Sequence, residues 1–268
     1  MSPPGRPKGE YRSAKHEGTP MGVAVTTAVV LAGGLGTRLR SAVPDLPKPM
    51  APVAGQPFLA HLLDHWIGQG VRRFVLSVGY RHEAIRSHFG IAYRGAAIDY
   101  AVEATPLGTG GALRLAADGL DADERFLLLN GDTWFGVDLA RLGAFAAKAE
   151  ADWCFSLFRT AEQDRYLGIE LGEGGRIEGL RARIPATGGL ANGGAYLVHP
   201  RALAGLAPGT APVSLENDLF PRFLAAGQRF VGLPCDVPFI DIGVPADWRR
   251  AADVISSRHP EPTHALHH

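Results

Sequence analysis

The chain has 268 residues, which is enough to bury one large α/β core or two small ones. Its 27 basic and 27 acidic side chains cancel, so no overall charge attracts nucleic acid or an anionic membrane, and any anion-binding site must be local. Only two cysteines are present, so neither a disulfide framework nor a zinc cluster is indicated. No apolar stretch reaches the roughly 18 residues of a membrane span and no signal-peptide core opens the chain, so we expect a cytoplasmic protein.

Composition separates two terminal tails from one folded domain. The first twenty residues are rich in proline, glycine and charge and lack apolar periodicity, which predicts a disordered tail over residues 1–22. Residues 258–268 are predicted to be a second, loose tail, and their histidines give no reason to assign a metal-binding function. We expect a single domain over residues 23–257.

Between the tails, strand-like and helix-like segments alternate. Residues 26–31 form an apolar, β-branched run typical of a buried strand, and a helix is expected to begin at Pro57 and to end at Gly70. The next elements are predicted at 74–78 (strand), 82–88 (helix), 98–102 (strand) and 126–130 (strand). This order predicts an α/β fold, Rossmann-like and three-layered, with a mixed but largely parallel central sheet. Ligands of such folds bind outside the carboxyl ends of the strands.

A glycine-rich turn follows the first strand. Gly33, Gly34 and Gly36 allow a ligand to approach backbone N–H groups, which attract anions. Arg38 and Lys48 would add two positive charges at the same place, so the segment is predicted to bind phosphate. The spacing does not fit the G-x-G-x-x-G of dinucleotide-binding folds, because a leucine stands where the last glycine is needed. It does not fit the loop of nucleoside triphosphatases either, because no G-K-[ST] follows.

Two later apolar segments end in an acidic residue. The run FLLLNGDTWF carries Asp132 after its strand, and PFIDIGVPADW carries Asp241 shortly before a glycine. By itself, an acid at the end of a strand serves a turn or a helix cap as readily as it binds a ligand. Mg²⁺, however, commonly takes one or two carboxylates from a protein together with substrate phosphates. For that role, these two acids would have to meet in space.

Together, G-G-x-G-T-R-L at 33–39 and P-K-P-M at 47–50 resemble the signature of the sugar-phosphate nucleotidyltransferases, which make nucleotide-activated sugars. The resemblance extends over roughly residues 26 to 254 and implies the Rossmann-like fold of that family. It also implies that Asp132 and Asp241 hold Mg²⁺, because they match the family's G-D and I-D-I-G carboxylates. By the same resemblance, Arg38, Lys48 and Asp132 are the expected catalytic residues.

The resemblance also implies which residues bind the nucleotide. The segment that begins at Glu103 is similar to the family's base-recognition segment. A carboxylate there favours guanine, because it can accept from both N1–H and the exocyclic amine, whereas uracil offers one N–H between two carbonyls. The alternative for Glu103 is a solvated charge at the end of a strand. The residues expected to bind the nucleotide are Leu31, Ala32, Gly33, Gly34, Gly36, Thr37, Glu103, Pro106, Gly108 and Thr109.

Sugar-side residues are expected from three further matches. The segment YLGI is similar to a family Tyr-x-Gly whose backbone touches the sugar, here at Gly168, and Asn192 opens a segment similar to Asn-Ala-Gly-Ile-Tyr. Glu216 matches a loop that could hold sugar hydroxyls. One element departs from the pattern, because many relatives bind the sugar phosphate with a Glu-Lys pair where this chain has alanine and Arg183. Arg183 can still grip a phosphate, although arginine and lysine differ in geometry.

The predicted reaction is transfer of a nucleotidyl group from a nucleoside triphosphate, with GTP favoured, to a sugar 1-phosphate with release of pyrophosphate. Within the family, the chain looks most similar to the D-glycero-D-manno-heptose 1-phosphate guanylyltransferases, followed by the mannose 1-phosphate guanylyltransferases. An amino-sugar 1-phosphate uridylyltransferase is the alternative enzyme. The alternative of another class is a catalytically silent subunit that senses nucleotide-sugars, although such relatives usually lose the arginine, lysine or metal aspartates that this chain keeps. The oligomeric state is left open.

Overall fold

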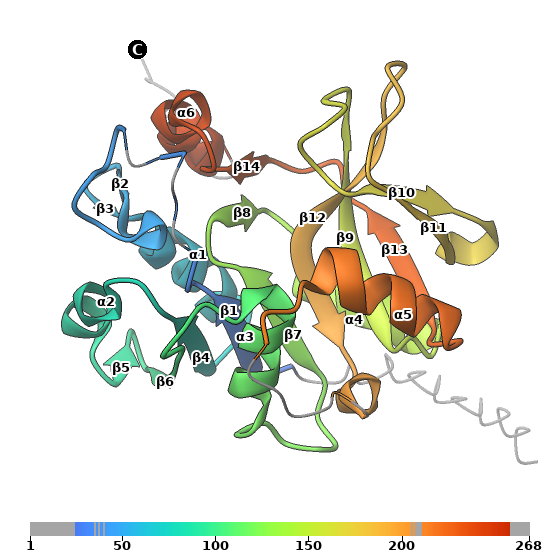
Figure 1. Ribbon diagram of the computed structural model, residues 1–268, viewed down its shortest axis with the longest axis horizontal. Coiled ribbons are helices and arrows are strands. Elements are labelled where there is room, and N and C mark those ends of the chain that lie inside the picture. The colour runs from blue at the N-terminus through green and yellow to red at the C-terminus, as the bar shows by residue number, and fades with distance from the viewer. Residues whose placement is uncertain are drawn as a thin grey trace, which may run out of the picture.

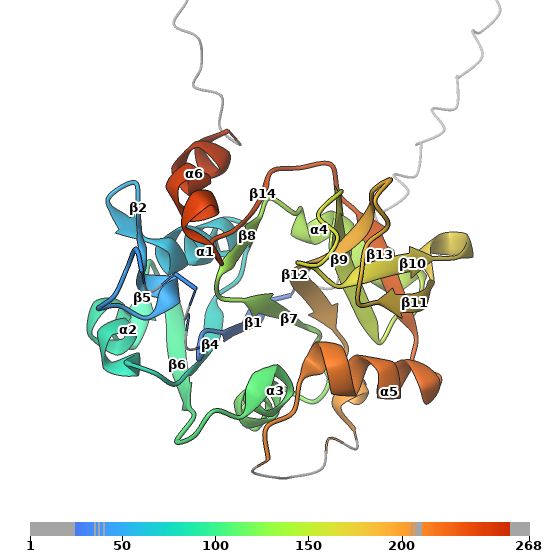
Figure 2. The same cartoon turned by 45° about the horizontal axis from the view of Figure 1, so that its top comes forward.

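The computed structural model describes residues 25–257 except Leu35, Thr37, Arg40, Gly205 and residues 207–210. The predicted tails at 1–22 and 258–268 lie outside the described residues. A mixed sheet lies between two layers of helices (Figures 1 and 2). None of the helices in the described part of the chain has the length and apolar character needed to cross a membrane.

Within the described residues, the main sheet has ten strands: β1 (Thr27–Leu31), β4 (Arg73–Val78), β5 (Ala92–Tyr93), β6 (Ala96–Val102), β7 (Phe126–Asn130), β9 (Trp153–Thr160), β10 (Gly168–Leu171), β11 (Ile177–Arg181), β12 (Gly189–Val198) and β13 (Phe230–Pro234). Their order is β11-β10-β12-β7-β1-β4-β6-β5, with β9 also paired to β12 and β13 paired to β9. Two small ribbons are formed by β2 (Pro52–Val53) with β3 (Gln56–Pro57), and by β8 (Thr133–Phe135) with β14 (Phe239–Asp241).

The helices of the layers are α1 (Phe58–Ile67), α2 (His82–Phe89), α3 (Gly108–Ala117), α4 (Leu139–Lys148), α5 (Phe220–Ala225) and α6 (Pro245–Ser256). Short helical turns lie in the connections: η1 (Lys48–Met50), η2 (Glu173–Gly175), η3 (Pro200–Leu203) and η4 (Leu215–Leu219). The strands β7, β1, β4 and β6 are parallel, whereas β12 runs antiparallel to β7 and β5 runs antiparallel to β6. The predicted three-layer α/β fold with a mixed sheet is confirmed.

The predicted elements lie close to the observed ones. β7 has the predicted bounds, and β6 begins two residues before the predicted strand. The helix expected from Pro57 begins at Phe58, because Pro57 pairs with Pro52 in the ribbon of β2 and β3. The same helix ends at Ile67, before the expected Gly70. None of these differences alters the fold, because each concerns only the end of an element.

Alternation along the buried strands explains the three layers. In β1, Ala28 and Val30 belong to one core cluster with α1, α2 and α4, whereas Val29 belongs to the other cluster with α3 and α5. Figure 2 shows α3 and α5 on one side of the sheet. Successive side chains of a strand point to opposite faces, so a run that is apolar at every position must be covered on both. Burial of each large side chain contributes roughly 1.5–3 kcal/mol.

Strand pairing places the functional segments together. β1 and β7 are parallel neighbours with Leu31 opposite Asn130, so the glycine turn and the segment of Asp132 leave the same edge of the sheet. In the second ribbon, Asp241 of β14 lies opposite Thr133 of β8. Two acids far apart in the sequence are therefore brought side by side by a three-residue antiparallel pairing.

Gly131 provides a test of this junction. Its N–H donates to the carbonyl oxygen of Leu31 at 2.9 Å, and a Cβ at Gly131 would lie 2.8 Å from that same oxygen. We predict that Gly131→Ala lowers the free energy of unfolding by roughly 1–3 kcal/mol, as measured by urea denaturation. Gly143→Ala in α4 is the control, because a Cβ there meets no atom within 4 Å and should stabilise the helix by about 0.5–1 kcal/mol. Equal stability of Gly131→Ala and the wild type would contradict the prediction.

Candidate active site

A cavity of about 280 Å³ opens at the carboxyl ends of β1, β6 and β7. Of the residues expected to bind the nucleotide, those that line this cavity are Leu31, Ala32, Gly33, Gly34, Glu103, Pro106, Gly108 and Thr109. Lys48 and Asp132 line it as well. Gly36 lies outside the lining but packs against the side chain of Lys48, and Arg38 is exposed. Thr37 lies outside the described residues.

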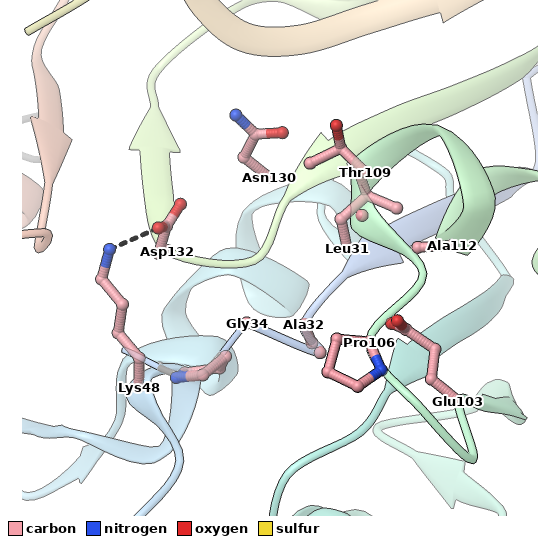
Figure 3. Close-up of a pocket in the computed structure, with 13 residues that line it drawn as sticks. Leu31, Ala32, Gly34, Lys48, Glu103, Pro106, Thr109, Ala112, Asn130 and Asp132 are labelled. Atoms are coloured by element: carbon pink, nitrogen blue, oxygen red, sulfur yellow. Dashed lines mark hydrogen bonds and ion pairs between the residues drawn. The ribbon is translucent and has the colours of Figure 1, made fainter. Parts of the chain in front are cut away.

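Lys48 reaches across the edge of this cavity to two acids. Its ammonium group forms an ion pair with Asp132, as Figure 3 shows, and its Nζ lies 3.7 Å from Oδ1 of Asp241. Lys48 begins the turn η1, and the buried Met50 at the end of that turn fixes its backbone. The side chains of Lys48 and Asp241 are only 12% and 16% exposed, so little water screens their attraction. The structure thus brings together three residues that come from three distant segments.

Burial and the neighbouring charges move the two carboxylates in opposite directions. Burial would raise the pKa of Asp132, but the charge of Lys48 and the hydrogen bonds from Lys48 and Thr133 outweigh burial and hold that pKa below its usual range. Burial and repulsion by Asp132 raise the pKa of Asp241, and the attraction of Lys48 and Arg165 does not offset them. The two carboxylates therefore repel each other even with Lys48 and Arg165 beside them, and a hard cation would relieve that repulsion.

The protein offers few ligands to a metal ion at Asp132 and Asp241. In the described part of the chain, no group of three or more His, Cys, Asp or Glu side chains could hold a metal ion. An ion at Asp132 and Asp241 would therefore take its other ligands from water or substrate, as Mg²⁺ commonly does. The oxygen-only donor pair fits such an ion.

Arg165 is a site residue that sequence analysis did not identify. Its Nη2 donates to the carbonyl oxygen of Asp241 at 2.9 Å and lies 3.3 Å from the Oδ2 of Asp241. Its Nη1 pairs with Asp247 in the first turn of α6, and its guanidinium lies 4.9 Å from the ring centre of Tyr166. Burial would lower the pKa of Arg165, but the hydrogen bond to Asp247 and the charge of Asp241 raise it. The only signal in the sequence was its position directly before Tyr166.

Glu103 lies on the wall of the cavity (Figure 3), which Gly33 also lines. A Cβ at Gly33 would overlap Oε1 of Glu103, so this close approach requires glycine. The backbone N–H of Leu107 donates to Oε2 of Glu103 at 2.9 Å, and the hydroxyl of Ser77 donates to Oε1 at 3.4 Å. These contacts hold the carboxylate at the cavity, in contrast to the alternative of a freely solvated charge.

A second cavity of about 180 Å³ adjoins the first and shares Asn130 and Asp132 with it. Two of the expected sugar-side residues, Asn192 and Glu216, line this cavity, and so does Asp241. The amide of Asn192 is fixed, because its Oδ1 accepts from the N–H of residue 194 at 3.1 Å and its Nδ2 donates to a buried tyrosine hydroxyl at 2.6 Å. The two cavities therefore meet at the acid that Lys48 holds.

Two other expected sugar-side residues are not brought to this cavity. Gly168 begins β10 and lines a different hollow, and the preceding Leu167 lines the cavity in its place. Arg183 pairs with Asp164 at 2.9 Å, and both side chains are more than 60% exposed. The arginine that does line the second cavity is Arg165.

Comparison with known proteins identifies the family of this chain. The model of the nucleotidyl transferase family matches residues 27–257. The chain belongs to the nucleotidyl transferase family. This nucleotidyltransferase is 38% identical to the D-glycero-alpha-D-manno-heptose 1-phosphate guanylyltransferase of Aneurinibacillus thermoaerophilus, over 84% of the chain and 96% of that protein. It is 35% identical to the mannose-1-phosphate guanylyltransferase of Mycobacterium tuberculosis, over 88% of the chain and 66% of that protein.

A solved structure gives the same result. The nucleotidyltransferase is similar to HddC from Yersinia pseudotuberculosis complexed with GMP-PN, with a TM-score of 0.72 and 30% identity over 85% of the chain and 99% of that structure. These likenesses confirm the resemblance to the sugar-phosphate nucleotidyltransferases that the glycine-rich and P-K-P-M segments indicated. They also confirm the prediction of an enzyme of the sugar-1-phosphate nucleotidyltransferase type.

Asp247 gives a pH-dependent test of the charge network in this nucleotidyltransferase. Burial would raise the pKa of Asp247, but hydrogen bonds from Arg165 and Arg250 outweigh burial and hold that pKa below its usual range. A carboxylate of this kind stabilises the fold at neutral pH, and the stabilisation is lost as the pH falls through its folded pKa. We predict that Asp247→Asn lowers the free energy of unfolding by roughly 1–3 kcal/mol at neutral pH. The difference from wild type should shrink below about pH 4.

Urea denaturation across a pH series measures both parts of this prediction. Asp253→Asn is the matched control, because Asp253 is exposed on the same helix. A loss of stability as large in Asp253→Asn as in Asp247→Asn, or one that does not change with pH, would contradict the role given to Asp247.

Proposed function

We propose that this enzyme transfers the GMP group of GTP to D-glycero-α-D-manno-heptose 1-phosphate, forming the GDP-sugar and releasing pyrophosphate. The observation that carries the proposal is the meeting of two cavities at Asp132, one beside Gly33 and Glu103 and the other beside Asn192 and Glu216. Two cavities that meet in this way suit a nucleotide in one and a sugar phosphate in the other. The likeness to a relative named for this heptose reaction, and to a structure complexed with GMP-PN, supports the choice of substrates.

The nucleotide would occupy the first cavity. The backbone N–H groups of the turn at Gly33 and Gly34, together with Arg38, would bind the β and γ phosphates. Glu103 would accept the N1–H and the exocyclic amine of guanine. Each carboxylate oxygen can accept more than one hydrogen bond, so Glu103 can keep the contacts from Leu107 and Ser77 while it binds the base.

The reaction mainly requires that the two substrates are aligned and that the charge of their phosphates is neutralised. An oxygen of the sugar 1-phosphate would attack the α-phosphorus in line with the departing pyrophosphate. Lys48 lies at the junction of the two cavities, where its ammonium group would neutralise the α-phosphate. No general base is needed, because a phosphate monoester is already an anion near neutral pH.

Enzymes of this family generally use a divalent metal ion, and we propose Mg²⁺ for this chain. Asp132 and Asp241 would hold it, because carboxylate oxygens suit a hard cation and a bound cation would relieve the repulsion between them. When bound, the ion would supply charge neutralisation to the phosphates of both substrates. Arg165 would keep Asp241 in place through its contacts with the backbone and side chain of that residue.

Mannose 1-phosphate is the second candidate acceptor. The likeness to the mannose-1-phosphate guanylyltransferase of Mycobacterium tuberculosis favours it, at an identity only slightly lower than that of the heptose relative. The two sugars share the configuration of the pyranose ring and differ in the exocyclic chain. The residues at Asn192 and Glu216 could therefore serve either acceptor.

Pyrophosphate release from a panel of substrates tests the proposal. GTP, UTP, CTP, ATP and dTTP are each combined with the 1-phosphates of D-glycero-α-D-manno-heptose, mannose, glucose and N-acetylglucosamine. We expect the highest kcat/KM with GTP and the heptose 1-phosphate, followed by GTP and mannose 1-phosphate. A preference for UTP with the amino sugar would contradict the proposal, and silence on every pair would favour a nucleotide-sugar-sensing subunit.

Changing Glu103→Gln tests the choice of base. Glutamine keeps the size of the side chain but replaces one acceptor oxygen by a donor group. We predict that kcat/KM for GTP falls roughly 10- to 100-fold while kcat/KM for UTP changes little. Glu178→Gln is the control, because Glu178 is an exposed acid on β11, outside the linings of both hollows that Glu103 lines. An unchanged ratio of GTP to UTP use in Glu103→Gln would refute the role in base recognition.

A further inference from the structure

The hydroxyl of Thr109 lines the nucleotide cavity, but its hydrogen bonds lead to the sugar cavity. Thr109 lies in the first turn of α3 and lines the first cavity. Its Oγ1 donates to Oε2 of Glu216 at 2.8 Å and accepts from the backbone N–H of Leu215 at 2.8 Å. A hydroxyl has one proton to donate, so that proton is used on Glu216 and is not available to a phosphate or a base.

Glu216 is the side chain that this contact orients. It lines the second cavity together with Asp132 and Asp241. The hydroxyl of Ser214 also donates to Oε2 of Glu216, at 3.1 Å. Oε2 therefore has two hydroxyl donors, and Oε1, which neither of them engages, is left to accept from a ligand.

The backbone next to Glu216 is hydrogen-bonded to the same turn of α3. The N–H of Val213 donates to the carbonyl oxygen of Leu107, and the N–H of Gly110 donates to that of Val213, both at 2.8 Å. A Cβ at Gly108 would lie 2.6 Å from the carbonyl oxygen of Val213, so this approach requires glycine. The position of the sugar-side loop is thus set by the helix that borders the nucleotide cavity.

We infer that Thr109 is a positioning residue of the sugar subsite, whose hydroxyl orients the carboxylate of Glu216 to accept a hydrogen bond from a hydroxyl of the pyranose ring. The inference rests on the proposed function for the identity of the sugar. It moves the Thr109 hydroxyl, which sequence analysis expected to bind the nucleotide, to the other substrate. Loss of this hydroxyl leaves the N–H of Leu215 without its acceptor and Glu216 with one donor fewer.

Two substitutions separate the hydroxyl from the rest of the side chain. Thr109→Val removes the hydroxyl at nearly constant volume, and Thr109→Ser keeps it; Thr109→Ala replaces the valine variant if that variant does not fold. Calorimetry measures the binding of GDP and of GDP-mannose, whose ring hydroxyls have the manno configuration. We expect the wild type and Thr109→Ser to bind GDP-mannose more tightly than GDP. Thr109→Val should lose roughly 10-fold in affinity for GDP-mannose with its affinity for GDP unchanged.

Steady-state kinetics gives a second readout. In Thr109→Val the KM for the sugar 1-phosphate should rise roughly 10- to 100-fold while the KM for GTP stays the same. Because Thr109 acts through Glu216, Thr109→Val should cost no further affinity for GDP-mannose when it is added to Glu216→Gln.

Four results would overturn the inference: additive losses in the double variant, a Thr109→Ser variant as weak as Thr109→Val, a loss of GDP affinity in Thr109→Val, or equal affinity of the wild type for GDP and GDP-mannose. Failure of the proposed function is seen separately, as absence of pyrophosphate release by the wild type with every sugar 1-phosphate. In that event, the binding comparison still decides the role of Thr109.

Discussion

The attraction of Lys48 to Asp132 and Asp241 is the interaction on which the rest of the site depends. Pairing of β8 with β14 puts the two carboxylates side by side, and their repulsion opposes that pairing. Lys48 on one side and Arg165 on the other attract these carboxylates but do not cancel the repulsion between them. The result is a pair of repelling carboxylates at the junction of two cavities, which gives the same residues a structural and a chemical role.

The parallel core of the sheet explains why these residues meet. β1, β6 and β7 all end at one edge, so the turn at Gly33, the carboxylate of Glu103 and the segment of Asp132 need no long connections to come together. The sugar-side residues come from β12 and η4, on the antiparallel side of the sheet. Contacts between the first turn of α3 and the segment at Val213 join the two halves. The site is therefore assembled from both parts of a mixed sheet.

The sequence was sufficient for β1, α1, β4, α2, β6 and β7, because β7 and β1 are uninterrupted apolar runs and proline and glycine lie near the ends of α1. The glycine turn and Lys48 were recognisable because their spacing is local. Arg165 was not, because its partners Asp241 and Asp247 are distant in the sequence and only the fold brings them to it. Gly168 shows the limit at the level of one residue. Leu167 and Gly168 are neighbours at the start of β10 but face different cavities, so a sequence pattern does not decide which of them lines the sugar cavity.

Anomalous diffraction from Mn²⁺, in crystals of the enzyme with a non-hydrolysable GTP analogue, tests the central claim most directly. Mn²⁺ accepts the oxygen ligands that suit Mg²⁺ and can be located by its scattering. We expect one Mn²⁺ bound by the carboxylates of both Asp132 and Asp241, with the phosphates of the analogue against the turn at Gly33. An analogue bound in the first cavity with its Mn²⁺ held by neither carboxylate would contradict that claim.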